Sequence, residues 1–203
     1  MRISDDRYSR DLHRFELALR FIKLEARTHT IRLWTGLSDD RIRKLYHSYG
    51  SMHGEHAVRR HRGKSPQQVA WFTRSPQVAE EAAALAGICC MFEVISPQPG
   101  QPGACALHSA ARGELLCHAY ETYRAIVRPG CISFEHAVFL VTALACGDEL
   151  RLVPCPRCRA LLLTDQLTLR RPQCTQCLDA PQRRPPPVMP AATRHPAAAA
   201  SSC

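Results

Sequence analysis

The sequence predicts a mainly α-helical protein: a helical bundle with a helix-turn-helix-like N-terminal part, followed by a small C-terminal ribbon that carries four cysteines. Three observations support this fold class. Apolar residues recur every three or four positions through most of residues 10–146, as expected of helices that bury one face. After position 150 the apolar runs become short, as in strands. Two matched pairs of cysteines lie in this last part of the chain.

The first predicted helix covers residues 10–27. Its apolar side chains alternate between spacings of three and four, at Leu12, Phe15, Leu19, Ile22 and Ala26. Such a stripe lies along one face of a helix. We therefore expect this face to pack against the rest of the bundle, with the charged side chains pointing to solvent.

A helix-turn-helix-like unit is predicted next, within residues 10–50. A short helix over 30–35 ends at Gly36, and Ser38 is a good N-cap for a second helix. The outward face of that helix carries Arg41, Arg43 and Lys44. In DNA-binding units of this type the second helix enters the major groove. Carboxylates at its start, Asp39 and Asp40, are unfavourable beside phosphates, and any helical hairpin has this pattern, so both interpretations stay open.

Residues 51–74 are predicted to form a basic loop, since glycines and a proline interrupt a stretch that holds Arg59, Arg60, Arg62 and Lys64. These cations either contact a polyanion or belong to an ordinary solvated loop. A helical core is predicted over 75–149, with helices at 75–95, 105–127 and 133–146. The last of these is nearly all apolar, so we expect it at the buried centre of the bundle.

The strongest local signal is the spacing of four cysteines, C-x2-C-x15-C-x2-C, formed by Cys155, Cys158, Cys174 and Cys177. Each pair can present two sulfurs from one tight turn, and two such turns complete a tetrahedron of thiolates around zinc. Such a closed site has no open position for a substrate, so we expect one structural zinc per chain. The linker predicts a hairpin in which residues 160–164 turn near Asp165 and return as 167–169.

The cysteine count and the charge distribution restrict the class of protein. The 203 residues include 11 cysteines, and the N-terminus lacks the apolar segment of a secretory signal. We therefore expect a cytoplasmic chain with metal-binding rather than disulfide-bonded cysteines. The apolar runs are too short to cross a membrane. No nucleophile-elbow, phosphate-loop or HExxH motif is present, so no enzymatic activity is expected.

The net charge of +9 is unevenly distributed. Residues 1–74 carry +8 and residues 151–203 carry +6, whereas residues 75–150 carry −5. Basic ends favour a nucleic acid partner, and the acidic middle favours a scaffold or a surface for another protein. We divide the chain into a helical domain (1–149), a zinc ribbon (150–179) and a Pro- and Ala-rich tail (180–203) that is predicted to be disordered.

Three segments in order carry a resemblance to a known family. They are the stretch from Thr35 to Tyr46 (TGLSDDRIRKLY), the segment 62–66 (RGKSP) followed by Trp71 and Phe72, and the two cysteine pairs after an all-helical middle. Together they resemble FlhC, the family of bacterial flagellar transcriptional activator subunits. The resemblance spans about residues 10–178, while residues 51–61 and the tail depart from it.

The resemblance implies a DNA-binding subunit that acts in a hetero-oligomer with FlhD, binds double-stranded promoter DNA of flagellar genes and helps to recruit RNA polymerase. It also implies that the four cysteines are zinc ligands. From charge alone, the candidate DNA contacts are Arg41, Arg43, Lys44, Arg59, Arg60, Arg62, Lys64, Arg157, Arg159, Arg170 and Arg171. The alternative is a zinc-ribbon interaction or assembly module that does not bind DNA directly.

Overall fold

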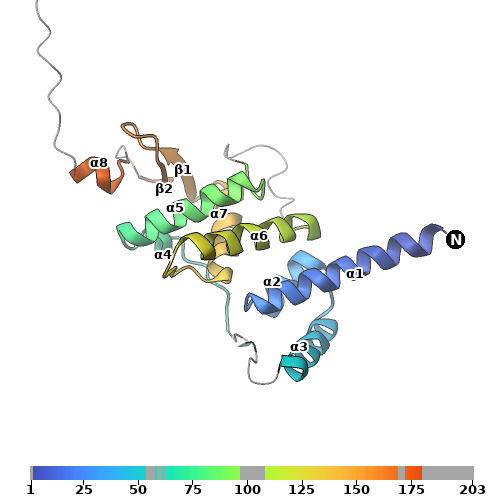
Figure 1. The fold of residues 1–203 in the computed structure, drawn as a ribbon. Helices are drawn as coiled ribbons and strands as arrows, with labels where there is room; N and C mark the ends of the chain where they lie inside the picture. Colours follow the sequence, from blue (N-terminus) through green and yellow to red (C-terminus); the bar gives the residue numbers. More distant parts are fainter. Residues whose placement is uncertain are drawn as a thin grey trace, which may run out of the picture.

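A computed structural model describes residues 2–53, 58, 61, 63–96, 108–168 and 172–179. It is mostly helical with one small two-stranded sheet, as predicted (Figure 1). In chain order the elements are α1 (Arg2–Lys23), α2 (Thr28–Thr35), α3 (Asp39–His53), α4 (Ala70–Thr73), α5 (Pro76–Met91), α6 (Ala110–Ile126), α7 (Phe134–Cys146), β1 (Leu150–Pro154), β2 (Leu161–Asp165) and α8 (Thr175–Asp179). The predicted disordered tail, 180–203, lies outside the described residues.

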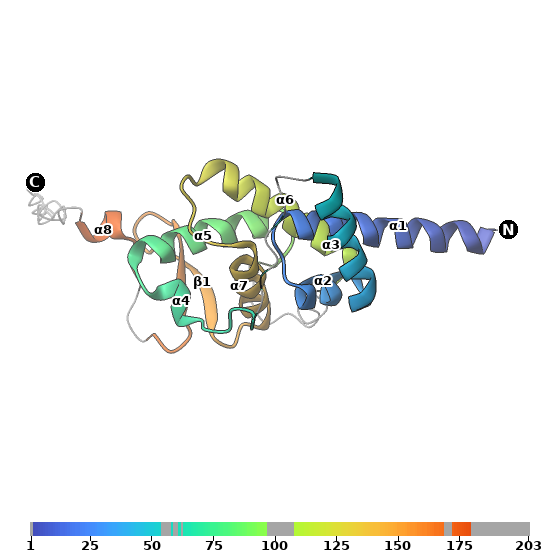
Figure 2. The ribbon, with the colours of Figure 1, turned by 90° about the horizontal axis from the view of Figure 1, so that it is seen from below.

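The elements are arranged along one direction (Figure 2). Helices α1, α2 and α3 lie at one end and α8 lies at the other. Between them lie α5, α6 and α7, with the β1–β2 hairpin packed against α5 and α7. As expected, α7 is central: six of its apolar side chains are buried, at Phe134, Ala137, Val138, Leu140, Val141 and Leu144. In the part of the chain that is described, no helix combines the length and apolarity needed to cross a membrane.

The buried face of α1 differs from the predicted one. The helix packs against α2, α3 and α6 through Leu17, Ala18 and Phe21, which are fully buried. The predicted stripe is confirmed at its C-terminal end, where Ile22 and Ala26 are fully buried. It is wrong at its start, where Leu12 is 46% exposed, and its middle members, Phe15 and Leu19, are only half-buried. The sequence places apolar residues on two faces of α1, and periodicity cannot say which of them the fold covers.

Helices α1 and α5 end earlier than predicted, and they end in the same way. Glu25 (φ +60°) and Glu93 (φ +57°) take the left-handed conformation directly after these helices. The Ala26 N–H then donates to the Phe21 carbonyl at 2.9 Å, and the Val94 N–H donates to the Cys89 carbonyl at 2.9 Å. This is the Schellman arrangement, usually built on glycine, so a glutamate gave no sequence signal that the helix stops there.

The predicted helix, turn and helix are present in α2 and α3. Gly36 takes a left-handed conformation (φ +70°) that ends α2, and Leu37 is buried beneath the turn. The Ser38 hydroxyl accepts from the Arg41 N–H at 3.5 Å, and Asp39 and Asp40 occupy the first turn of α3, where the helix dipole favours negative charge.

The segment predicted as a basic loop is helical at both ends, which corrects that prediction. Helix α3 continues to His53, and α4 forms one turn before α5. The reason at the C-terminal end is aromatic packing: Phe72 is fully buried against Phe139, with ring centroids 5.8 Å apart, and Trp71 stacks on His136 at 4.0 Å. Burial of these rings fixes the chain that enters α5.

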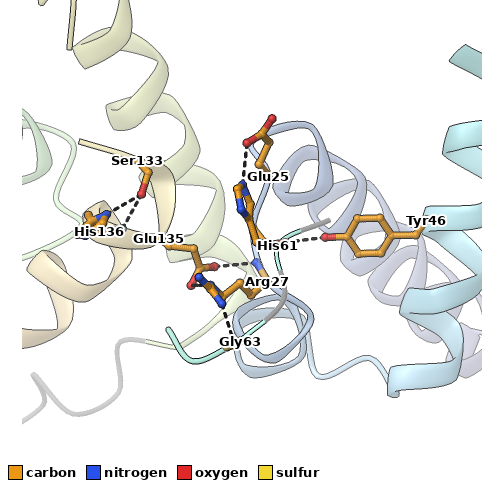
Figure 3. Close-up of polar contacts among 9 residues, drawn as sticks. Glu25, Arg27, Tyr46, His61, Gly63, Ser133, Glu135 and His136 are labelled. Atoms are coloured by element: carbon orange, nitrogen blue, oxygen red, sulfur yellow. Dashed lines mark hydrogen bonds and ion pairs between the residues drawn. The ribbon is translucent and has the colours of Figure 1, made fainter. Parts of the chain in front are cut away.

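A polar joint connects the three N-terminal helices to the core (Figure 3). The carboxylate of Glu135, in the first turn of α7, is only 7% exposed and accepts from the Arg27 N–H at 2.7 Å. The Arg27 guanidinium donates in turn to the Gly63 carbonyl at 2.7 Å, and His61 contacts Glu25 at 2.9 Å. The segment before α4 is thereby attached to the link between α1 and α2.

A buried carboxylate stabilises the connection between α6 and α7. Glu81 of α5 accepts from the Tyr123 hydroxyl and from the N–H groups of Cys131 (2.6 Å) and Ile132 (3.1 Å). Burial alone would raise the pKa of Glu81, but these hydrogen bonds outweigh it and the pKa is lowered. The carboxylate is therefore charged and fully partnered inside the protein.

The hairpin is paired differently from the prediction. β1 and β2 are antiparallel, with Leu150 opposite Asp165 and Pro154 opposite Leu161. The partner of residues 161–165 is therefore the strand before the first cysteine pair. Of the residues predicted as the return strand, 167 lies in a turn and 168 has no regular structure, and 169 lies outside the described residues. The chain reverses at the first cysteine pair instead, because that tight turn joins the two strands.

Candidate metal centre

The first cysteine pair lies in the turn between β1 and β2. Two hydrogen bonds close this turn: the Cys155 N–H donates to the Ala160 carbonyl at 2.8 Å, and the Arg159 N–H donates to the Cys155 carbonyl at 2.9 Å. Arg159 is left-handed, with φ +65°. The turn thus points Cys155 and Cys158 to the same side.

The second pair lies at the start of α8. The Leu178 N–H donates to the Cys174 carbonyl at 3.0 Å, and the Cys177 N–H donates to the same carbonyl at 3.1 Å. This single helical turn brings the sulfurs of Cys174 and Cys177 together, because residues three apart on a helical turn lie on one side.

The four sulfurs meet in one cluster and lie within 4.8 Å of one another. Sγ of Cys158 and Sγ of Cys174 are 3.4 Å apart, which is too far for a disulfide bond. Thiolates at about 2.3 Å from a tetrahedral metal ion would be separated by about 3.8 Å, so the cluster has the right size. Cys155 and Cys174 are buried, while Cys158 is exposed and Cys177 is half-buried. The four cysteines can therefore hold a metal ion.

The backbone supports a negative charge on one of these sulfurs. The N–H group of Cys158, followed by those of Cys174 and Arg157, lowers the pKa of Cys155 to about 6. The neighbouring thiols act in the opposite direction on Cys177, whose hydrogen bond with Cys174 is the largest contribution that raises its pKa to about 12. A cation between the sulfurs favours the thiolate form of all four, and protons leave as it binds.

Two contacts outside the cluster hold its parts in place. The Arg157 guanidinium donates to the Cys177 carbonyl at 2.6 Å, which ties the first cysteine turn to the second. The Thr175 hydroxyl donates to Glu80 of α5, which ties the second turn to the helical core. Below them, Leu161 of β2 lies close to Gly87 of α5, where an added Cβ would be 3.4 Å from the leucine. Leu150 and Leu163 of the hairpin belong to the same buried core as the helices.

The predicted DNA contacts lie on separate parts of the molecule. Arg43 pairs with Asp40 at 2.9 Å, and Arg41 lies 5.6 Å from the centroid of the Phe15 ring. Lys44 and Lys64 are exposed, as are Arg157 and Arg159 beside the cysteines. The structure does not bring the cations of α3 and those of the hairpin together, since α3 and the hairpin lie on opposite sides of the central helices (Figure 1). The other candidates, Arg59, Arg60, Arg62, Arg170 and Arg171, lie outside the described residues.

The sequence did not indicate two features, one at the cysteine cluster and one beside the polar joint. The spacing of the cysteines gave no sign that Arg157 has a structural contact, because its partner is a backbone carbonyl 20 positions away. It also missed a cleft of about 630 Å³ beside the polar joint, which four cations line, at Lys23, Arg27, Arg124 and Arg128. Three carboxylates, Glu25, Glu121 and Glu135, line the same cleft and offset most of that charge. We therefore do not assign it a ligand.

No protein-family model matches the sequence, and no curated protein matches it at a significant level. The features that indicate a function are therefore the cysteine cluster, the charge distribution and the resemblance that the motifs carry.

Proposed function

We propose that the protein is a DNA-binding subunit of a transcriptional activator, stabilised by one structural zinc ion. The observation that carries the proposal is the cluster of four cysteine sulfurs, within 4.8 Å of one another, on a hairpin that packs on the helical core. Four thiolates in a tetrahedral arrangement suit zinc, which has no redox chemistry of its own and occupies closed sites of this kind. The zinc would supply folding energy to the hairpin.

The charge distribution supports DNA as the partner. Residues 151–203 carry +6, and in the described part of that segment Arg157 and Arg159 are exposed on the first cysteine turn. Residues 1–74 carry +8, with Lys44 exposed on α3 and Lys64 exposed beside Gly63 of the polar joint. Cations on a rigid frame can neutralise phosphates and release counterions, which drives binding to DNA. The middle of the chain, at −5, is a poor DNA surface and suits contacts with protein.

The finer assignment follows from the resemblance to FlhC. On that basis the protein acts in a hetero-oligomer with FlhD, binds promoters of flagellar genes and helps to recruit RNA polymerase. We propose this role for the chain in the cytoplasm, with no enzymatic activity of its own.

The test is binding of the zinc-loaded full chain to a double-stranded promoter fragment, with and without co-expressed FlhD, followed by fluorescence anisotropy. We expect binding that weakens as salt rises, with a slope of log K against log salt of about −0.9 for each phosphate contacted. We also expect tighter binding with FlhD. An affinity that does not change with salt would contradict the electrostatic argument.

A matched pair of variants separates specific contacts from total charge. Lys44→Gln and Arg124→Gln each remove one exposed positive charge, the first from α3 and the second from the acidic middle. We expect the first to weaken binding and to lower the magnitude of the salt slope by about 0.9, and the second to have little effect. Equal losses would mean that only the net charge matters.

The second candidate function is a zinc-ribbon interaction or assembly module without direct DNA binding. The charges at the start of α3 favour this alternative. Asp39 pairs with Arg32 and Asp40 pairs with Arg43, so these carboxylates neutralise cations that would otherwise face DNA phosphates. A zinc-loaded chain that forms a stable complex with FlhD but binds no duplex at low salt would establish this alternative.

A further inference from the structure

Helix α1 carries a second apolar face that the fold covers only in part. The residues Tyr8, Leu12, Phe15 and Leu19, here called the α1 seam, follow spacings of four, three and four. At 3.6 residues per turn they lie on one side of the helix, and Leu17 lies about 170° away from their centre. Leu17 is buried in the core, whereas Tyr8 is 71% exposed and Leu12 is 46% exposed. The fold therefore uses one apolar face of α1 and leaves part of the other in water.

The open part of the seam lies where α1 extends beyond the rest of the molecule (Figures 1 and 2). Contacts with the core begin further along the helix, where His13 is 3.2 Å from Glu114 of α6 and Arg41 of α3 reaches Phe15. A spacing alternating between three and four is that of a coiled-coil seam, in which each apolar residue packs between residues of a neighbouring helix. The shape and pattern of this face fit a second helix lying alongside α1.

The charges beside the seam specify the chemistry of that second helix. Asp11 and Glu16 lie on opposite sides of the seam, each about 70° from its centre, at the positions that face the flanks of a paired helix. The nearby cations Arg10 and Arg14 project about 130° or more from the centre. Arg14 pairs with Asp11 at 3.7 Å, but both side chains stay exposed, and an exposed ion pair of this kind is weak enough for Asp11 to exchange it for a cation of a docked helix. A cation of the chain itself already contacts the seam, because the Arg41 guanidinium lies over the ring of Phe15.

We propose that the α1 seam docks an amphipathic helix of a different protein, with an apolar stripe flanked by lysine or arginine. A second copy of α1 is a poor occupant, because its own Asp11 and Glu16 would face the same carboxylates. The inference goes beyond the proposed function and holds whether or not the chain binds DNA.

The test uses two designed peptides of about three heptads with the same leucine stripe, one with lysine and one with glutamate at the flanking positions. Binding of each labelled peptide to the full chain is measured by fluorescence anisotropy at low salt. We expect the lysine peptide to bind at least about tenfold more tightly, a preference that salt reduces. Equal affinities, or no binding of either peptide, would overturn the proposal.

A matched pair of variants locates the binding face. Leu12 on the seam is 46% exposed and Leu33 on α2 is 45% exposed, so replacing either leaves the core intact. We expect Leu12→Gln to weaken binding of the lysine peptide at least about fivefold and Leu33→Gln to leave it unchanged, with the same circular dichroism for both. Equal effects would overturn the assignment. So would sedimentation that shows a dimer of the wild-type chain which Leu12→Gln dissociates, since the occupant would then be a second copy.

Discussion

Arg159 offers a direct test of the first cysteine turn, because it occupies a conformation that suits glycine. Its φ of +65° places it in the left-handed region, directly after Cys158. An L-residue with a side chain is disfavoured there by steric contact of Cβ with the backbone, and glycine is not. We therefore expect Arg159→Gly to stabilise the turn. Arg159→Ala is the matched control, because it removes the same charge but keeps Cβ.

The expected difference follows from the backbone alone. Relief of a left-handed conformation contributes about 1–2 kcal/mol, and the greater freedom of glycine in the unfolded chain offsets about 0.4–1 kcal/mol of it. The glycine variant should therefore exceed the alanine variant by about 1 kcal/mol in free energy of unfolding, or about 2–4 °C in Tm for a chain of this size. The Arg159 side chain is exposed, so lost packing adds little.

The assay is thermal unfolding of the zinc-loaded full chain followed by circular dichroism, with release of metal to a chromophoric chelator recorded in parallel. A glycine variant no more stable than the alanine variant would refute the conformation assigned to the turn. Both variants should lose the same DNA affinity if Arg159 contacts a phosphate, with a salt slope smaller by about 0.9. The same pair thus tests the fold and the DNA contact separately.

Three further predictions concern buried and exposed charges. Glu81→Gln should lower the free energy of unfolding at pH 7 by about 1–3 kcal/mol, because it weakens hydrogen bonds from Tyr123, Cys131 and Ile132. Because the pKa of Glu81 is lowered in the folded protein, the stability that its charge contributes is complete above the ordinary carboxyl pKa and is lost as pH falls through the lower folded pKa. The free energy of unfolding, measured by denaturation from pH 7 to pH 3, should therefore fall more steeply in wild type than in the variant. Asp40→Asn should strengthen DNA binding about two- to threefold by releasing Arg43, and weaker binding in anisotropy would contradict the proposed role of α3. Glu135→Ala should lower the Tm measured by calorimetry by several degrees, because the Arg27 N–H and guanidinium lose a buried acceptor; an unchanged Tm would mean that the polar joint contributes no stability.

Local signals in the sequence predicted the helices well where a cap marks the end. Ser75, which precedes a proline, is the N-cap of α5 as expected. Gly147 is the C-cap of α7 as expected. Glu25 and Glu93 ended helices without such a signal, since the left-handed conformation there is imposed by the surrounding packing. Periodicity predicted that α1 is amphipathic, but the choice between its two apolar faces depends on α6 and α3, which are distant in sequence.

The cluster of four cysteines was predictable because each pair is a local turn and the pairs match. Their meeting within 4.8 Å agrees with the spacing. The strand pairing was not predictable from the alternation of residues 167–169, because the register depends on where the chain reverses, and it reverses at the first cysteine pair. The contacts of Arg157 with the Cys177 carbonyl and of Thr175 with Glu80 join segments far apart in the chain, so no local pattern indicates them.

The proposed role depends most on one zinc ion held by the four cysteines. Native mass spectrometry of the full chain, purified with zinc and without reductant, measures this directly. We predict one zinc per chain, lost in Cys174→Ser together with the ordered hairpin, because the binding energy of a structural metal is folding energy. A wild-type chain without metal, or one whose mass shows disulfides among Cys155, Cys158, Cys174 and Cys177, would contradict the account.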